Sequence, residues 1–514
     1  MDKNTRTINS IKNITTGFLG QIVQTVLGFI SRTIFIKCLA TEYLGISGLF
    51  TNILSILSLA ELGVGSAIIY ALYKPLADKD EYKISSLMNF YSKSYKIIGI
   101  SIGIVGLSIL PFIEFIINDI PNIEESIYLI YFLYLFNTVI TYFFSYKNSI
   151  IIGDQKNYIS SIISYAVSFF QTIIQIIILL ITKDFLLYLI TQSVFSLIYN
   201  IIISKKADKM YPYLKKNKDA QLDRGIKNEL VSNIKSLMMI KLSGVLVNNT
   251  DNIIISKFSG LSAVGLCSNY NLLISIINSI LAQIFGGITA SVGNLNAKET
   301  NEKKEELFKV INFINFWLFG FSAVCIVILS NDVIKLWIGE EFILPISIPL
   351  VLAINFYMVG MQNAVWTYKN TMGLFKHGRY LLIVTGIINL VLSVILGKYM
   401  GLFGILISTA ISRGLTNAWY DPYAVYKYGF KKSSKSYIIR YLKFVIIIGL
   451  ILIIDGYLCS LLKGPVFIVF IMKIIICVSV SNIIIVATFY KTDEFKYIMN
   501  LGNFILSNIR AKLA

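Results

Sequence analysis

Residues 158–182 read YISSIISYAVSFFQTIIQIIILLIT, an unbroken stretch of 25 residues without a charged side chain. At 1.5 Å of rise per residue, a helix of this length crosses a hydrocarbon core of about 30 Å. A helix also satisfies its own backbone hydrogen bonds, which lipid cannot do. The stretch therefore predicts a membrane-spanning α-helix.

Similar apolar stretches run through the rest of the chain. Hydrophobic residues make up 56% of the 514 residues, charged residues only 14%, and the mean hydropathy is +0.71. These values lie far from those of a soluble domain. We expect an all-α polytopic membrane protein with about fourteen transmembrane helices, near 12–37, 43–72, 84–117, 122–146, 158–182, 184–204, 232–256, 262–292, 305–330, 343–368, 380–397, 400–427, 437–458 and 464–490.

The net charge of +18 is distributed unevenly along the chain. Of the 46 Lys and Arg residues, 36 fall in the N-terminus, in alternate loops and in the C-terminal tail, whereas the other loops hold six. This asymmetry predicts that both termini are cytoplasmic, and it explains the positive charge without nucleic acid. The polar segment Met1–Lys12 leads into an apolar helix without a signal-peptide cleavage site, so we expect a retained first span.

Two short motifs recur at nearly the same offset. Tyr146-Lys147-Asn148 matches Tyr368-Lys369-Asn370 at an offset of 222, and Leu44-Gly45-Ile46 matches Val264-Gly265-Leu266 at 220. The repeat unit holds six spans, so the two copies have the same orientation in the membrane. We expect two six-helix lobes related by a pseudo-two-fold axis along the membrane normal, plus an appended helix pair. The predicted limits are 1–204 and 232–427 for the lobes, 205–231 for a basic cytoplasmic linker, and 428–514 for helices 13 and 14 with a cytoplasmic tail.

Polar side chains line one face of the first predicted span and one face of the seventh. In both spans they follow steps of three or four residues. The two stripes are Gln21, Thr25, Gly28 and Arg32, and Lys241, Gly244, Asn248 and Asp251. Because the repeat makes the stripes equivalent, we expect both to face one cavity. Arg32 and Asp251 would form an outer gate there as an opposite-charge pair.

Charged side chains near mid-membrane are costly and indicate function. Glu61 and Arg413 lie near the middle of spans two and twelve, and Lys241 lies at a comparable depth. Among the charged residues of the two stripes and of the middle of the membrane, the cations Arg32, Lys241 and Arg413 outnumber the anions Glu61 and Asp251. This balance favours an anionic ligand.

The alternative interpretation of such charges is that they pair to hold helices together. One pair of this kind is expected between Asp455 and Lys473, which lie in the two appended spans.

The motifs of several enzyme classes are missing from the sequence. It has no G-x-x-x-x-G-K-[ST] phosphate loop, no Ser-His-Asp arrangement and no spacing typical of metal ligands, and its one histidine is His377. The five cysteines are scattered, which argues against a disulfide framework. We therefore expect a protein without a cofactor, a metal site or catalytic residues.

Four segments resemble a known family. Three are Glu42–Phe50, Ala60–Gly65 and Leu72–Ala77, and the fourth is Asn249–Ser256, which is followed by Ala263–Gly265. With the predicted topology they resemble the polysaccharide (oligosaccharide-lipid) flippases of the multidrug/oligosaccharidyl-lipid/polysaccharide (MOP) exporter superfamily.

The resemblance implies a multi-pass protein of the bacterial plasma (inner) membrane. Such a protein moves a polyprenyl-diphosphate-linked oligosaccharide from the cytoplasmic to the outer leaflet by alternating access, in contact with membrane lipids. Whether a coupling ion takes part stays open at this point. On that basis the diphosphate ligands are Arg32, Lys241 and Arg413, the glycan ligands are Asn248, Gln21 and Asn52, and the gating or coupling residues are Glu61 and Asp251. Spans thirteen and fourteen would shelter the polyprenyl tail.

Three other functions stay open at this point. A peptidoglycan-precursor flippase shares the span count and the cationic cavity. A multidrug exporter of the same superfamily would need anionic sites for cationic drugs, which the charge balance disfavours. A membrane glycan polymerase would carry a large external loop, and the predicted external loops are short.

Overall fold

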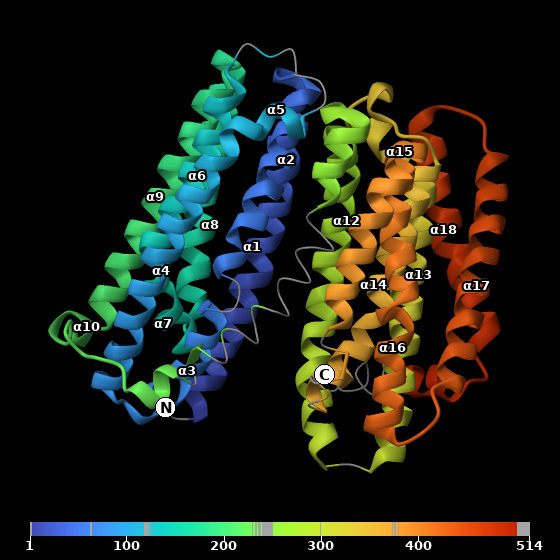
Figure 1. The fold of residues 1–514 in the computed structure, drawn as a ribbon. Helices are drawn as coiled ribbons and strands as arrows, with labels where there is room; N and C mark the ends of the chain where they lie inside the picture. The colour runs from blue at the N-terminus through green and yellow to red at the C-terminus, as the bar shows by residue number, and fades with distance from the viewer. Residues whose placement is uncertain are drawn as a thin grey trace, which may run out of the picture. The chain divides into compact units, whose positions relative to one another are not determined.

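The computed structural model describes residues 3–61, 64–117, 123, 125–228, 230–231, 234, 238, 250–298, 300–372, 374, 377–378 and 380–500. Over these residues the secondary structure is entirely helical (Figure 1). The chain forms two compact units, Met1–Gly265 and Leu266–Ala514. The predicted all-α class is confirmed.

The first unit is built from long apolar helices and short connecting turns. Its helices are α1 (Lys3–Cys38), α2 (Thr41–Leu57), α3 (Val64–Asp78), α4 (Glu81–Ile109), α5 (Ile113–Ile116), α6 (Ile127–Phe144), α7 (Asn148–Gly153), α8 (Asn157–Thr182), α9 (Phe185–Met210) and α10 (Tyr213–Lys216). The predicted span 158–182 coincides with α8 within one residue.

The second predicted span, 43–72, is broken in the structure. After α2 the chain forms a 3-10 turn, Ser58–Glu61, and α3 begins at Val64. The Ser58 hydroxyl donates to the Leu54 carbonyl oxygen at 2.8 Å, a local bond that competes with the regular helix. Gly63 and Gly65 have low helix propensity, which favours the break. The expectation of one continuous helix here was wrong.

The second unit has the longer helices. The bounds are α12 (Asp251–Lys298, which starts in the first unit), α13 (Asn301–Trp337), α14 (Ser347–Thr371), α15 (Leu381–Leu415), α16 (Asn417–Ala424), the π-helical segment η5 (Val425–Phe430), α17 (Lys435–Ser460) and α18 (Val466–Phe489).

The helix α15 is a tight antiparallel hairpin that turns at Gly401. This residue has φ 56° and ψ −138°, a conformation that glycine adopts without steric cost. Three polar pairs join the two arms: Thr385 with Thr416 at 2.7 Å, Asn389 with Thr409 at 2.9 Å and Ser393 with Ser408 at 2.5 Å. The turn lies where the sequence separates the predicted spans 380–397 and 400–427.

The spacing of helix starts matches the sequence repeat. The helices α4 and α13 begin at Glu81 and Asn301, and α6 and α14 begin at Ile127 and Ser347, so each pair is 220 residues apart. Helical geometry in α12 is interrupted at Gly260, 220 residues after Ala40, which precedes α2. The helical elements thus recur at the offset of the Leu44-Gly45-Ile46 motif.

Eleven helices of the described residues are long and apolar enough to cross a membrane. One of these stretches, Leu381–Phe430, contains the α15 hairpin, and α2 and α3 are too short to be included. Most of the predicted span 232–256 lies outside the described residues. The protein is a multi-pass membrane protein, whereas the count of fourteen spans and the predicted lobe limits stay predictions.

The first part of the predicted linker belongs to the first unit and packs against α4. The side-chain amide of Asn89, on α4, donates to the backbone carbonyl oxygens of Asn217, Lys218 and Ala220 at 3.1, 2.9 and 3.1 Å. The turn after α10 is therefore fastened to α4.

The α15 hairpin yields a stability prediction. A Cβ atom at Gly404 would lie 2.2 Å from the Leu396 carbonyl oxygen across the hairpin, whereas one at Gly414 would meet nothing within 4 Å. Because the two arms must separate, Gly404→Ala should destabilise the protein by about 1–3 kcal/mol. Gly414→Ala, in the same arm, should stabilise it by about 0.5–1 kcal/mol through helix propensity. Thermal unfolding midpoints in detergent measure both, and equal midpoints would contradict the hairpin packing.

Candidate functional site

The helix α1 has one packed face and one open face. A Cβ atom at Gly20 would lie 1.9 Å from the Tyr165 ring of α8, so the two helices are in close contact there. A Cβ atom at Gly28 would meet no atom within 4 Å. Gly28 belongs to the predicted polar stripe with Gln21 and Arg32, which are both half-buried. The stripe thus borders a space in which a side chain can be accommodated.

Two tyrosines from neighbouring helices interact with Arg32. The phenol groups of Tyr134, on α6, and Tyr188, on α9, lie close enough to interact electrostatically with its guanidinium. One helical turn further along α1, Phe35 packs edge-on against Tyr188 at a centroid distance of 5.5 Å. Arg32 is therefore held among rings from α6 and α9.

Glu61 ends the 3-10 turn between α2 and α3 and is bound by two tyrosines. The Tyr95 hydroxyl donates to Glu61 Oε1 at 2.5 Å, and the Tyr142 hydroxyl donates to Oε2 at 2.9 Å. Tyr91 packs against Tyr95 at 4.3 Å between centroids, and Ser149 donates to the Tyr91 hydroxyl at 3.2 Å. The break in the predicted span thus places an acidic group inside a tyrosine cluster, which sequence spacing did not reveal.

Four other predicted site residues have less defined surroundings or lie outside the described residues. Asn52, on α2, is half-buried, and so is Asp251, the first residue of α12. Lys241 and Asn248 lie outside the described residues. The structure therefore leaves the predicted second stripe and the Arg32–Asp251 gate as predictions.

Arg413 is buried in the second arm of the α15 hairpin, with 7% of its surface exposed. Polar side chains follow it directly along the chain. The Thr416 hydroxyl donates to the Ser412 carbonyl oxygen at 2.5 Å, and the Asn417 amide donates to Gln362 Oε1 of α14 at 3.2 Å. A buried arginine beside a polar seam is a site at which an anion can be neutralised.

The repeated Tyr-Lys-Asn motif forms equivalent ion pairs in the two halves. In the first, Lys147 Nζ lies 2.7 Å from Asp208 Oδ1 of α9. In the second, Lys369 Nζ lies 2.6 Å from Asp421 Oδ1 of α16, whose other oxygen accepts from the Trp366 indole at 3.1 Å. The recurrence of the motif predicted the repeat but not these ion pairs, although the recurring lysine was the available signal for them.

The appended helices α17 and α18 are joined to α13 by polar contacts. Lys473, on α18, pairs with Asp332 of α13 at 2.7 Å, and Trp317 donates to Asn482 of α18 at 2.8 Å. Asp455, on α17, accepts from the Ser481 hydroxyl at 2.6 Å. The expected Asp455–Lys473 pair was therefore wrong, because each residue has a different partner.

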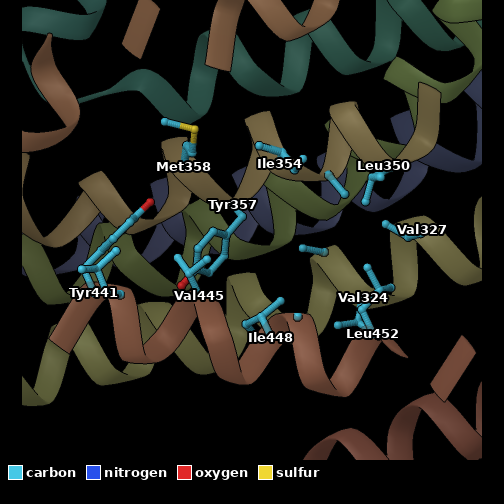
Figure 2. A pocket seen from close by; sticks show the side chains of 14 residues that line it. Val324, Val327, Leu350, Ile354, Tyr357, Met358, Tyr441, Val445, Ile448 and Leu452 are labelled. Atoms are coloured by element: carbon cyan, nitrogen blue, oxygen red, sulfur yellow. The ribbon is translucent and has the colours of Figure 1, made fainter. Parts of the chain in front are cut away.

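An apolar cavity of about 460 Å³ lies between α13, α14 and α17 (Figure 2). Figure 2 shows Val324 and Val327 of α13, Ile354 and Met358 of α14, and Val445 and Ile448 of α17 around it. The two hydroxyl-bearing residues in its lining are Tyr357 and Tyr441. A lining of this kind suits a hydrocarbon chain.

Solved structures with this fold are membrane transporters. A lipid II flippase, MurJ, in an inward closed conformation is 15% identical, with a TM-score of 0.60 over 94% of this chain and 99% of that one. A multidrug resistance MATE family transporter of the MOP superfamily, in an inward-facing conformation, is 15% identical, with a TM-score of 0.56 over 76% of this chain and 92% of that one. A MOP superfamily transporter from Pyrococcus furiosus is 14% identical, with a TM-score of 0.53 over 83% of this chain and 96% of that one. At these identities the likeness establishes the fold.

A comparison with curated proteins finds no match. The polysaccharide biosynthesis protein family matches residues 10–292, which is more than half of the chain and includes most of α1, the Glu61 cluster and most of α12. The chain therefore belongs to the polysaccharide biosynthesis protein family.

Proposed function

We propose that this protein is a flippase that moves a polyprenyl-diphosphate-linked oligosaccharide from the cytoplasmic to the outer leaflet of a bacterial plasma membrane by alternating access. The observation that carries the proposal is the buried Arg413 in a chain of the polysaccharide biosynthesis family. A buried arginine in a spanning helix is costly to place there, which indicates a functional role. The diphosphate group offers two acceptor-rich phosphates for bidentate contacts.

The other cations of the proposed headgroup site are Arg32 and Lys241. Arg32 lies on the α1 stripe beside the open position at Gly28. Gln21 and Asn52, both half-buried, and Asn248 supply amide groups for glycan hydroxyls in this proposal. These polar groups replace part of the hydration that a diphosphate and a sugar lose inside the membrane.

The apolar cavity beside α17 is the proposed place for the polyprenyl chain. Its volume of about 460 Å³ and its aliphatic lining fit several isoprene units. A tail held there stays in an apolar environment while the charged head crosses.

Glu61 is the proposed coupling residue. Its carboxylate accepts two tyrosine hydroxyl bonds at the break between α2 and α3, so a change in its charge acts on a helix junction. The proposed outer gate pairs Arg32 with Asp251. The close packing of α2 against the first part of α12 supports a gate there. A Cβ atom at Gly45 of α2 would lie 2.1 Å from the Leu261 carbonyl oxygen.

A peptidoglycan-precursor flippase is the second candidate, because the fold aligns over 94% of this chain with the lipid II flippase MurJ. Both functions need a lipid diphosphate site, and they differ in the attached sugar. Complementation of cells that lack each type of flippase separates the two.

Replacing Arg413 tests the headgroup site. Arg413→Gln removes the charge, so transport of lipid-linked oligosaccharide in proteoliposomes should fall at least tenfold, whereas Arg413→Lys should keep part of it because the charge remains. Arg224→Gln, which changes an exposed arginine, is the control. Membrane abundance is measured in parallel, and full transport by Arg413→Gln at normal abundance would contradict the assignment.

Replacing Glu61 tests coupling. Glu61→Gln keeps the shape of the side chain but removes its charge, so transport should no longer respond to an imposed pH gradient. The control is Glu114→Gln, because Glu114 also accepts a tyrosine hydroxyl bond, from Tyr128 at 2.6 Å, but on an exposed surface. A normal pH response in Glu61→Gln would remove this residue from the coupling mechanism.

Thiol labelling tests the proposed orientation. Lys218→Cys and Ser126→Cys, made singly in a cysteine-free protein, place thiols at two exposed positions. In intact cells a membrane-impermeant maleimide should label position 126 and spare position 218, and both should react after permeabilisation. Labelling of position 218 in intact cells would reverse the topology.

A further inference from the structure

Aromatic side chains collect on one exposed face at the end of the second repeat. We call this set the aromatic face; it consists of Trp419, Tyr420, Tyr423, Lys427, Tyr428 and His377. The first five lie on α16 and η5, and His377 lies in the turn between α14 and α15. None of these residues has a part in the headgroup, tail or coupling sites proposed above.

The rings form a connected series. The centroid distances are 5.7 Å between Trp419 and Tyr420 and 5.8 Å between Tyr420 and Tyr423. At the other end the His377 ring is stacked on Tyr428, with centroids 3.8 Å apart and ring planes 11° apart. Trp419 and Tyr428 are 49% and 41% exposed, so both present ring surface to the exterior.

A cation lies within the series. Lys427 Nζ donates to the Tyr423 hydroxyl at 2.6 Å and lies 5.1 and 5.5 Å from the centroids of the Tyr423 and Tyr428 rings. The face thus combines ring surfaces with hydrogen-bond donors.

Backbone geometry fixes the positions of these side chains. Residues Val425–Phe430 form a π-helical turn, a conformation that occurs frequently at functional sites, and Lys431 after it has φ 57°. Gly378 lets the turn from α14 approach closely: a Cβ atom there would lie 2.8 Å from the Tyr420 ring and 3.5 Å from Lys369 Nζ. The aromatic face therefore adjoins the buried Lys369–Asp421 pair, which holds α16 against α14.

We propose that the aromatic face binds the glycan of the lipid-linked substrate, an inference that rests on the proposed function. A pyranose ring has an apolar face of C–H groups that stacks on an aromatic ring, and equatorial hydroxyls that accept from an ammonium or a phenol. Trp419 and Tyr428 supply the stacking surfaces, and Lys427 and Tyr423 supply the polar contacts. An interfacial belt would instead place single rings at similar depth on several helices.

The test separates the glycan from the lipid. Full-length protein in nanodiscs is titrated with two probes: lipid-linked oligosaccharides extracted from the source cells, and undecaprenyl diphosphate without sugar. The double variant Trp419→Ala/Tyr428→Ala should weaken binding of the first probe at least tenfold and change binding of the second less than twofold. Trp419→Phe/Tyr428→Phe should restore most of the affinity. Tyr399→Ala is the control, because Tyr399 is 77% exposed and lies outside the aromatic face.

The other results distinguish a failure of the glycan inference from a failure of the proposed function. Equal loss for both probes means that the residues support the fold or the headgroup site, and it overturns the inference. No loss for either probe assigns the rings to the membrane interface, which also overturns it. Wild-type protein that binds neither probe contradicts the proposed function itself.

Discussion

Lipid offers no hydrogen-bond partners, so polar side chains between the helices of this protein have to bind within the protein. At Ser58–Glu61, where the chain departs from regular helix, two tyrosine hydroxyls from α4 and α6 bind the Glu61 carboxylate. In the α15 hairpin, which turns at Gly401, buried hydroxyl and amide side chains of the two arms bind one another. In both places the polar contacts that lipid withholds come from neighbouring helices or arms.

The same constraint accounts for the ion pairs of the repeat. Lys147–Asp208 and Lys369–Asp421 each join the helix that carries the Tyr-Lys-Asn motif to the last helix of its copy. The Asp421 side chain is only 4% exposed, so loss of Lys369 would leave a buried charge without its counterion at a cost of about 3–5 kcal/mol. The proposed alternating-access mechanism needs helices that stay together within each copy, and an ion pair of this kind joins two of them.

Much of the helical framework could be predicted from the sequence, because apolar length is a local property. Short windows of sequence located the span 158–182, which is α8, and the break between two spans near residue 400, where the chain turns at Gly401. The partners of buried polar groups could not be predicted in this way. Glu61 is bound by tyrosines 34 and 81 residues away. Lys473 contacts an aspartate 141 residues away and not the nearer Asp455. Such contacts depend on how helices pack, which periodicity does not specify.

The contact between Lys473 and Asp332 also affects the order in which α13 and α18 become stable in the membrane. Asp332 is synthesised 141 residues before its partner. At about 5–20 residues per second, the ribosome needs roughly 7–28 s to make the intervening chain. During this interval α13 is present without the counterion of Asp332, which lies near the end of the helix and can stay at the lipid–water boundary. The ion pair forms only when α18 is inserted, and a chain truncated before α18 would lack the Lys473 counterion.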